Sequence, residues 1–311
     1  MEKIIAIRET PPPESVMPPD ALYPSYENAP ALSKAGISAK LSQVLGKANP
    51  MFDTGSIYSG SALLCNVDTG DILVKKREKE RVYPASLTKL MTALIAIEHM
   101  PSLPEKIRFN KDIFPALYKA NSTMAGFLPG EEAHVQDIIY GAVLESGGEC
   151  CVALAYAIAG SEAGFVRMMN ARARELQMND THFANVTGLH DDRHFTTAKD
   201  LGKLLLFALN NSKFKEVFTA KEYMTSPTDL RAEGRLLKNG AMYGFGALDF
   251  EGGVLVGGKS GYTDEAGLCL ATMAVKKGTP YIFISTGNGI PSPGFAYSFA
   301  DAINAYENGI L

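Results

Sequence analysis

Two residues at the start of a predicted helix could act as a nucleophile and its base. Ser86 and Lys89 stand three positions apart, and residues at i and i+3 share one face of a helix, so the amine can reach the hydroxyl. A serine hydroxyl is a poor nucleophile until a base takes its proton, and a lysine removed from water can be that base. The helix N-terminus also directs backbone N–H groups at developing negative charge. The pattern is typical of nucleophilic catalysis by serine.

The same spacing occurs at Ser212 and Lys215, so spacing alone is weak evidence. Those residues lie in the polar string NNSKFKE, where a solvated surface is the simpler interpretation. Ser86 could likewise be an ordinary helix start with a solvated Lys89. Chemistry is favoured by the apolar residues that follow, Leu90, Met91, Leu94 and Ile95.

A second polar motif, Lys259-Ser260-Gly261, follows directly after the strand-like sequence GGVLVGG. Small residues there would let a substrate backbone lie along the strand edge as an added strand. A second amine at Lys259 would keep the pKa of Lys89 low and attract a carboxylate. Taken alone, the motif is equally well explained by a strand that ends in a charged turn.

The elements that must position these residues begin with a predicted β-hairpin. Its strands span about 57–66 and 71–75, around the turn Asp68-Thr69-Gly70. From Ser86 to about Phe218 the sequence is mainly helical, because apolar residues repeat at helical spacing, for example over 135–144 and 197–209.

Strands return after Gly240, and an amphipathic helix over about 294–306 ends the chain. The expected strands cover residues 253–258, 268–275 and 281–285. The order of strand pair, long helical block, strand set and last helix predicts an α+β fold. We expect an antiparallel sheet flanked by helices, with an inserted all-helical lobe at about 86–225.

Composition excludes several classes of protein. The chain has 311 residues, 46% of them hydrophobic, with 29 Gly and 4 Cys, which excludes collagen-like, disordered and disulfide-scaffold proteins. A net charge of −4 argues against a general nucleic-acid-binding surface. The four cysteines are expected to be small buried apolar residues.

The N-terminal region differs from the rest of the chain. Residues 1–54 contain Pro11-Pro12-Pro13 and Pro18-Pro19, which predicts an extended leader with one short helix at about 31–46. The globular domain is then expected to span 55–311. No apolar run approaches the roughly 18 residues of a membrane span, and the N-terminus has too short an apolar stretch for a signal peptide.

Other chemistry finds little support in the sequence. His190 and His194 have the i, i+4 spacing of a metal-binding pair, but HDDRH lacks the glutamate of a zinc-peptidase motif. The sequence contains neither a GxxxxGK[ST] phosphate loop nor a convincing dinucleotide fingerprint. We therefore expect neither a metal nor a cofactor.

Beyond single motifs, the chain resembles the D-alanyl-D-alanine carboxypeptidases, the low-molecular-weight penicillin-binding proteins, over about residues 55–311. A serine–lysine pair with a later lysine motif is typical of penicillin-recognising serine enzymes. The matching segments occur in the family's order: YPASLTKLMTALIAIE, MAGFLPGEEAHVQDIIYGAVLESGGECC, HFANVTGLHDDRHFTTAKDL and GGKSGYTDEAG. The resemblance implies a β-lactamase/transpeptidase-like fold with the active site between the sheet and the helical lobe.

The resemblance also implies an activity and its residues. Such an enzyme removes the terminal D-alanine of peptidoglycan stem peptides through an acyl-enzyme and is acylated by β-lactams. Ser86 matches the nucleophile and Lys89 its general base. Ser146 matches the first residue of the family's S-x-N element and would relay protons to the leaving group, while Lys259 would orient Ser146 and the substrate.

Four further residues are implied in substrate binding. Ser260 would hydrogen-bond the terminal carboxylate, and Gly261 lies in the same motif. The backbone N–H groups of Ser86 and Tyr262 would form the oxyanion hole. Gly148 stands where the family has an asparagine that helps to hold the substrate amide and the lysine.

Gly148 is therefore one of three departures from the family pattern. Ser260 replaces the commoner threonine, which keeps the hydroxyl. Many relatives also carry an arginine near the segment that here reads Thr286-Gly287-Asn288-Gly289. Carboxylate capture is then expected to rest on fewer groups.

The sequence leaves two alternative functions open. Gly148 would suit a catalytically weakened penicillin-binding or cell-wall sensing module. A serine β-lactamase is less favoured, because the stretch NDTHFANVTGLHDD offers no glutamate as a base for deacylation.

The substrate also predicts a location. Peptidoglycan lies outside the cytoplasmic membrane, so an extracytoplasmic protein is expected, with any membrane tether upstream of the Pro-rich leader. The second β-rich domain and C-terminal amphipathic anchor of many relatives are not expected after the Lys259 motif.

Overall fold

The computed structural model describes residues 52–245, 247–288 and 294–310, all within the unit Leu32–Leu311. The predicted short helix of the leader lies outside the described residues, as does Gly289. The boundary proposed at residue 54 stays a prediction.

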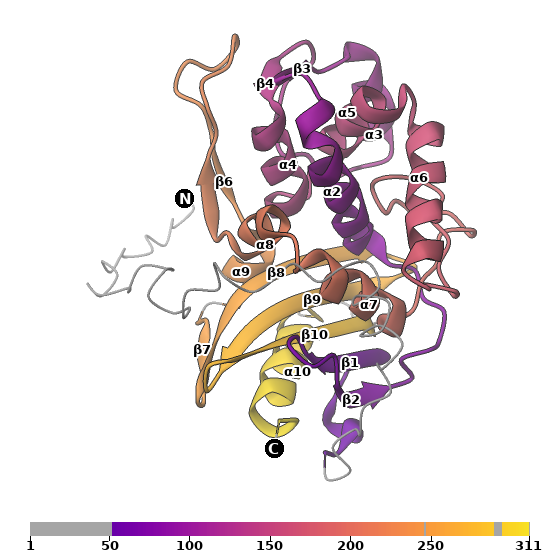
Figure 1. Ribbon diagram of the computed structural model, residues 1–311, viewed down its shortest axis with the longest axis vertical. Helices are drawn as coiled ribbons and strands as arrows, with labels where there is room; N and C mark the ends of the chain where they lie inside the picture. The colour runs from indigo at the N-terminus through magenta and orange to yellow at the C-terminus, as the bar shows by residue number, and fades with distance from the viewer. Residues whose placement is uncertain (1–51, 246, 289–293, 311) are drawn as a thin grey trace, which may run out of the picture. The chain divides into compact units, whose positions relative to one another are not determined.

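A six-stranded antiparallel sheet is the base on which the described elements pack (Figure 1). Its strand order is β2-β1-β10-β9-β8-β7. The strands are β1 (Ser61–Asn66), β2 (Ile72–Lys76), β7 (Asp249–Phe250), β8 (Gly253–Thr263), β9 (Gly267–Lys276) and β10 (Thr279–Asn288). The predicted hairpin and C-terminal strands are confirmed, and β8 continues through the whole Lys259-Ser260-Gly261 motif.

Helices cover both faces of this sheet. Alternate residues of β1 show why, because Ala62 and Leu64 pack toward α10 (Gly294–Asn308), whereas Leu63 and Cys65 join the core on the opposite face. On that opposite face, α7 (Ala198–Ala208) contacts β1 and β10. A sheet buried on both faces has few polar positions, which explains the near-continuous apolar sequence of β1, β9 and β10.

The helical lobe lies on the same side as α7 (Figure 1). It consists of α2 (Thr88–His99), α3 (Phe114–Lys119), α4 (Val135–Leu144), α5 (Gly148–Ala159), α6 (Glu162–Glu175) and α8 (Ser212–Thr219). The lobe is not all-helical, because β3 (Lys106–Arg108) pairs with β4 (Glu132–His134). A second pair, β5 (Glu222–Met224) and β6 (Leu236–Lys238), and the short α9 (Gly240–Gly244) lead back to the sheet. Single 3₁₀ turns complete the description at η3 (Thr54–Ser56), η4 (Ala85–Leu87), η5 (Met100–Ser102) and η6 (Lys111–Ile113).

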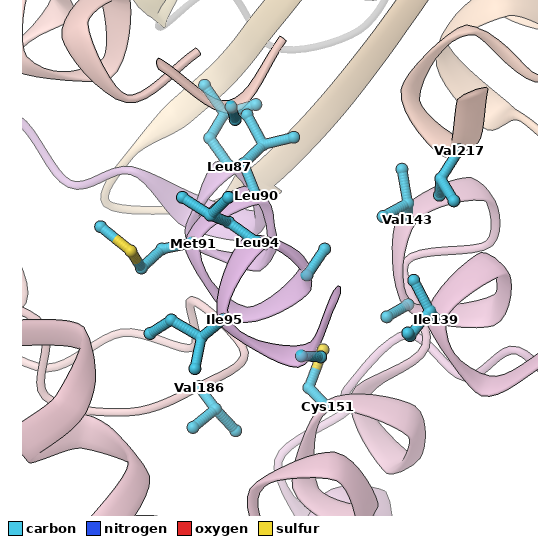
Figure 2. Close-up of a cluster of buried hydrophobic side chains, with 14 of the residues drawn as sticks. Leu87, Leu90, Met91, Leu94, Ile95, Ile139, Val143, Cys151, Val186 and Val217 are labelled. Carbon is cyan, nitrogen blue, oxygen red and sulfur yellow. The ribbon is translucent and has the colours of Figure 1, made fainter. Parts of the chain in front are cut away.

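Helix α2 runs through the middle of the lobe (Figure 2). Every residue from Thr88 to Ile97 is buried, so the helix is enclosed on all sides and not only on one face. Apolar side chains around it come from α4, α5, α8 and the 186 region, namely Ile139, Val143, Cys151, Val217 and Val186. This packing holds α2, and with it the residues at its start, in one position.

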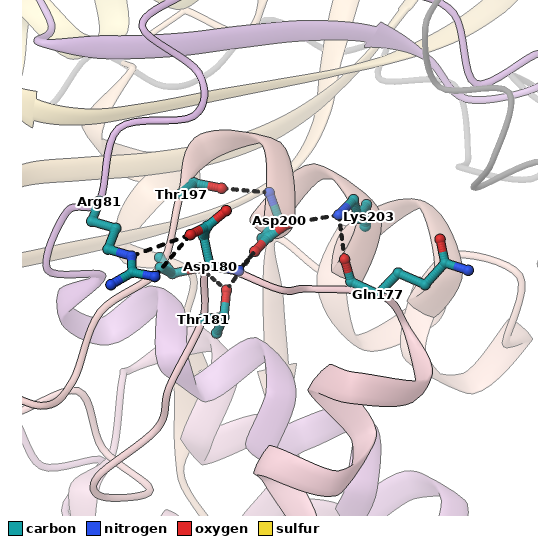
Figure 3. Close-up of polar contacts among 8 residues, drawn as sticks. Arg81, Gln177, Asp180, Thr181, Thr197, Asp200 and Lys203 are labelled. Atoms are coloured by element: carbon teal, nitrogen blue, oxygen red, sulfur yellow. Dashed lines mark hydrogen bonds and ion pairs between the residues drawn. The ribbon is translucent and has the colours of Figure 1, made fainter.

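A polar network fixes the chain just before η4 (Figure 3). The carboxylate of Asp200, at the start of α7, accepts hydrogen bonds from the Asp180 N–H, the Thr181 hydroxyl and the Lys203 amine at 3.0, 3.0 and 2.8 Å. The Arg81 guanidinium in turn binds the Asp180 carboxylate at 2.9 Å. Arg81 is thereby tied to α7, five residues ahead of Ser86 in the chain.

A buried carboxylate ties α10 to the start of β1. Asp301 is 1% exposed and accepts hydrogen bonds from the Tyr58 N–H, the Ser59 N–H and the Ser59 hydroxyl at 2.7, 2.8 and 2.6 Å. Hydrogen bonds to a buried charge are among the stronger polar contacts in proteins, so this contact anchors the C-terminal helix.

The cysteines and the helix lengths bear on two expectations from the sequence. All four cysteines are free and buried, which confirms their prediction as core residues. No single helix in the described ranges is long and apolar enough to span a membrane; α5 and α6 meet such a test only together, across a bend of 86°.

Candidate active site

The predicted nucleophile stands in a tight turn that precedes helix α2. Ser86 lies in η4, and Lys89 lies in the first turn of α2, so the two residues are not on one continuous α-helix as predicted. Ala85 has φ +46°, a left-handed conformation that is unusual for a residue with a side chain. Backbone strain of this kind persists only where the surrounding structure imposes it.

Lys89 reaches the serine in spite of the turn. Its Nζ hydrogen-bonds the Ser86 Oγ at 2.8 Å and donates to the Thr187 carbonyl at 2.6 Å. The side chain is 2% exposed, and burial lowers the pKa of its amine from the ordinary value. A lower pKa increases the neutral fraction of the amine, which is the form that can accept a proton. Ser212 of the similar Ser212–Lys215 pair is exposed on α8.

The loop that follows residue 184 holds this turn in place. The Asn185 Oδ1 accepts hydrogen bonds from the Thr187 and Gly188 N–H groups at 3.1 and 2.7 Å. Gly188 has φ +84°, and a Cβ added there would overlap the Ala85 carbonyl. These residues were not predicted from the sequence, although Asn and Gly in NVTG are ordinary turn residues.

Strand β8 lies directly against Ser86, the predicted nucleophile. A Cβ added at Gly261 would be 2.5 Å from the Ser86 backbone nitrogen, so the two backbones are close enough only because residue 261 is glycine. Strand β7 pairs only with Gly253 and Val254 at the far end of β8. Within the described residues, the Lys259–Thr263 edge therefore has no strand partner on its outer side.

The second lysine is also buried. Lys259 is 3% exposed, and its Nζ donates to the Ser260 carbonyl at 2.8 Å. Burial, with a smaller contribution from the charge of Lys89, lowers the pKa of Lys259 to about 7. Ser260 is half-buried and Tyr262 is exposed, so the end of the motif is open to solvent.

Ser146 lies at the turn between α4 and α5. It has φ +61°, and among the described residues its buried Oγ has no hydrogen-bond partner. The predicted contact between Ser146 and Lys259 is not among the hydrogen bonds of the described side chains, so that role stays a prediction. Gly148 begins α5, where its N–H donates to the Thr123 carbonyl at 2.7 Å.

Two hydrogen bonds hold the ring of His194 inside the protein. The Ala184 N–H donates to its Nδ1 at 3.3 Å, so Nε2 carries the proton and donates to the Thr88 Oγ1 at 2.8 Å. Burial lowers the pKa of His194 to about 4, which keeps the ring neutral. No group of three His, Cys, Asp or Glu side chains suited to a metal ion occurs in the part of the chain that the structure describes.

The segment where relatives carry an arginine lies away from the edge of β8. Thr286 pairs with Ser61 of β1, so β9 separates its strand from β8. The structure brings Ser86 into contact with Lys89 and with Gly261. Lys259, two residues before Gly261 on β8, is close enough for the charge of Lys89 to lower its pKa.

Known proteins are similar to this chain in sequence. A family model described as D-alanyl-D-alanine carboxypeptidase matches residues 47–288. The D-alanyl-D-alanine carboxypeptidase DacF of Bacillus subtilis is 36% identical over 242 residues, which cover 74% of this chain and 58% of DacF. DacD of Escherichia coli is 33% identical over 229 residues, which cover 70% of this chain and 55% of DacD.

The fold comparison agrees with these matches. The crystal structure of a Streptomyces DD-transpeptidase superposes with a TM-score of 0.71 at 25% identity, covering 81% of this chain and 97% of the other. The α+β, transpeptidase-like fold is thus confirmed. This chain spans little more than half the length of DacF and DacD. From the family match and these relatives, the chain belongs to the D-alanyl-D-alanine carboxypeptidase family.

Proposed function

We propose that this chain is a serine-type D-alanyl-D-alanine carboxypeptidase that removes the terminal D-alanine of peptidoglycan stem peptides. The observation that carries the proposal is the 2.8 Å contact between the Ser86 hydroxyl and the buried Lys89 amine. Family membership makes this chemistry the first expectation, and the lowered pKa of Lys89 supplies the base that the reaction needs.

In the acylation step, the Ser86 Oγ attacks the carbonyl carbon of the penultimate D-alanine, and Lys89 takes the hydroxyl proton. The backbone N–H groups of Ser86 and Tyr262 are proposed to stabilise the resulting oxyanion, a contribution worth about 10²–10³ in rate per donor. The C–N bond then breaks, and the departing amine of D-alanine takes a proton, for which Ser146 is the proposed relay. The product is a serine ester of the shortened peptide.

In the second step, water attacks the ester carbonyl and gives up a proton, which Lys89 is again placed to accept. The C–O bond to Ser86 breaks and the hydroxyl regains a proton. A β-lactam undergoes the same acylation step, in which the C–N bond of its ring is the bond that breaks. Its amine stays attached to the acyl group, so the adduct persists.

Substrate binding is proposed along the outer edge of β8. An extended peptide can add there as a strand, because the Lys259–Thr263 edge is unpaired within the described residues. The Ser260 hydroxyl and the positive charge of Lys259, when protonated, would hold the terminal carboxylate. We also propose that the protein is extracytoplasmic and that a membrane tether precedes the Pro-rich leader.

The test is covalent labelling combined with product release. Penicillin should add to Ser86 in a one-to-one adduct seen by mass spectrometry, and diacetyl-L-lysyl-D-alanyl-D-alanine should release D-alanine in a penicillin-sensitive, EDTA-insensitive reaction. Ser86→Ala should lose both, whereas Ser212→Ala, a matched change at the exposed serine of the Ser212–Lys215 pair, should lose neither. Labelling that persists in Ser86→Ala would refute the proposal.

A second candidate function is a sensing module that is acylated slowly, and it is favoured only by Gly148. The two functions differ in turnover. A sensor would form the penicillin adduct but release negligible D-alanine from the peptide.

A further inference from the structure

A cavity lies beyond the end of strand β8, next to the turn that joins β8 to β9. It measures about 420 Å³, and its described lining comes from the segment before η4, from residues 192–195 and from the turn after β8. The apolar part of this lining consists of Val82, Tyr83, Phe195 and Ala266. The charged residues of the cavity are Arg81, Asp192 and Glu265. This combination suits a ligand with an apolar chain and a charged end.

Among the described residues, no lysine or arginine pairs with the two acidic residues of the cavity. The Arg81 guanidinium binds the Asp180 carboxylate at 2.9 Å, so its charge is already matched (Figure 3). The His190 ring lies between the two carboxylates, with Nε2 3.4 Å from the Asp192 Oδ1 and Nδ1 3.8 Å from the Glu265 Oε2. Both distances exceed the roughly 2.7–3.2 Å of an N–H···O hydrogen bond. Asp192 and Glu265 therefore keep acceptor oxygens for a ligand.

The cavity is close to the proposed catalytic residues. Tyr83 precedes Ser86 by three residues, and three residues of extended chain span at most about 11 Å. Glu265 follows Tyr262 by the same number of residues. The hydrogen bond from the Tyr262 hydroxyl to Asp264 raises the pKa of Tyr262, and the charge of Glu265 adds a smaller contribution. The Glu265 carboxylate thus acts at the end of the strand edge that is proposed to bind substrate.

The proposed binding mode directs the substrate toward this cavity. Its terminal carboxylate lies at Lys259 and Ser260, and its scissile carbonyl lies at the Tyr262 N–H. The rest of the peptide therefore continues past Thr263 toward the turn before β9, antiparallel to β8. The residue that precedes the acylated D-alanine begins only about 3.8 Å further along the peptide. A long side chain on that residue can reach the cavity.

We propose that this cavity binds the free side-chain ammonium of a diamino acid that precedes the two D-alanines of the stem peptide, with Glu265 and Asp192 as its acceptors. The apolar wall packs against the methylene groups of that side chain, while its charged end reaches the carboxylates. The inference rests on the proposed function and adds the chemical class of one substrate residue. An amine that is already acylated in a cross-link carries no charge, so the enzyme favours stem peptides that are not cross-linked through this residue.

The test compares two peptides that differ only in this charge: Nα-acetyl-L-lysyl-D-alanyl-D-alanine, with a free ε-amine, and its diacetyl form. The ratio of their kcat/KM values for D-alanine release should favour the free amine about fivefold, because an ion pair near a protein surface contributes a factor of up to about five. Added salt should lower the ratio. Glu265→Gln should lower it in part, and Glu265→Gln/Asp192→Asn should bring it close to one.

Glu233→Gln is the matched control, because Glu233 is an exposed glutamate between β5 and β6 and lies outside the cavity. It removes the same charge and should keep the wild-type ratio. A merely structural role of Glu265 and Asp192 would lower both rates together in the double variant and leave the ratio unchanged, which would overturn the proposal. A wild-type ratio below about two would also overturn it.

Failure of this inference is distinguishable from failure of the proposed function. If wild-type protein forms no penicillin adduct on Ser86 and releases no D-alanine from either peptide, the proposed function fails and this inference with it. Release of D-alanine from both peptides at equal rates supports the proposed function and removes only the inference.

Discussion

The close approach of β8 to Ser86, the proposed nucleophile, predicts that Gly261 is a sensitive position for the proposed reaction. In Gly261→Ala, the new Cβ would stand 2.5 Å from the Ser86 nitrogen and 3.1 Å from the Ser86 Cα and Cβ. The obstructing atoms belong to backbone and to the nucleophile itself, so no flexible side chain can turn away. The strand and the η4 turn must separate instead.

The size of the effect follows from this geometry. Ordinary van der Waals contact begins near 3.4 Å, so the backbones must move apart by about 0.9 Å. A misplacement of about 1 Å in a reacting group can cost about 10²-fold in rate. Overpacking of a core contact typically costs only about 1–3 kcal/mol in stability. We expect Gly261→Ala to remain folded and to lose about 10²-fold in the second-order rate of penicillin acylation.

The assay is the time course of a fluorescent penicillin adduct, with circular dichroism and thermal unfolding measured in parallel. Gly240→Ala is the matched control, because the atom nearest to a Cβ added there is the Leu144 carbonyl oxygen at 4.0 Å. That variant should acylate at the wild-type rate. If Gly261→Ala acylates within threefold of the wild type, the backbone contact does not position the nucleophile and the reasoning is wrong.

Three further changes test other parts of the structure. Lys89→Met should lower penicillin acylation about 10³-fold with the fold retained, because it removes the base from an apolar site, and mass spectrometry of the adduct measures this. Burial lowers the folded-state pKa of Lys259 from 10.5 to about 7, so the unfolded state binds more protons over that range and wild-type stability rises with pH. Relative to the wild type, Lys259→Met should therefore have a higher free energy of unfolding in urea below pH 7, and the difference should be small near pH 10.5. An equal difference at both pH values would contradict the burial argument. Asp301→Ala should lose about 2–4 kcal/mol in the free energy of unfolding, because three hydrogen bonds from Tyr58 and Ser59 lose their acceptor; a loss under 1 kcal/mol would be contrary evidence.

The sequence predicted the architecture well where local patterns and burial agree. The helix predicted at residues 135–144 is α4, and the helix expected over 197–209 is α7, capped by the Thr197 hydroxyl on the Asp200 N–H at 3.0 Å. The strand pairs β3–β4 and β5–β6 were not predicted from the sequence. Each strand in them has three residues, too few for an alternating pattern to be recognised.

The site was predictable in its residue types and not in its geometry. Ser86, Lys89 and Lys259 could be found from motifs, but the 3₁₀ turn at η4 depends on Gly188, which packs on Ala85 from a loop about a hundred residues later. Contacts between distant segments leave no periodic pattern in sequence.

The apolar surroundings of α2 join stability and chemistry in one feature. A lysine on an exposed helix would keep its ordinary pKa and stay charged, unable to accept a proton at neutral pH. Because α2 is enclosed from Thr88 to Ile97, the Lys89 amine is desolvated by the same packing that holds the helix against α4 and α5. Burying a second amine at Lys259 adds a further cost in stability. The apolar residues after Ser86 thus serve the proposed chemistry, since a more polar α2 would let the pKa of Lys89 rise back toward its ordinary value.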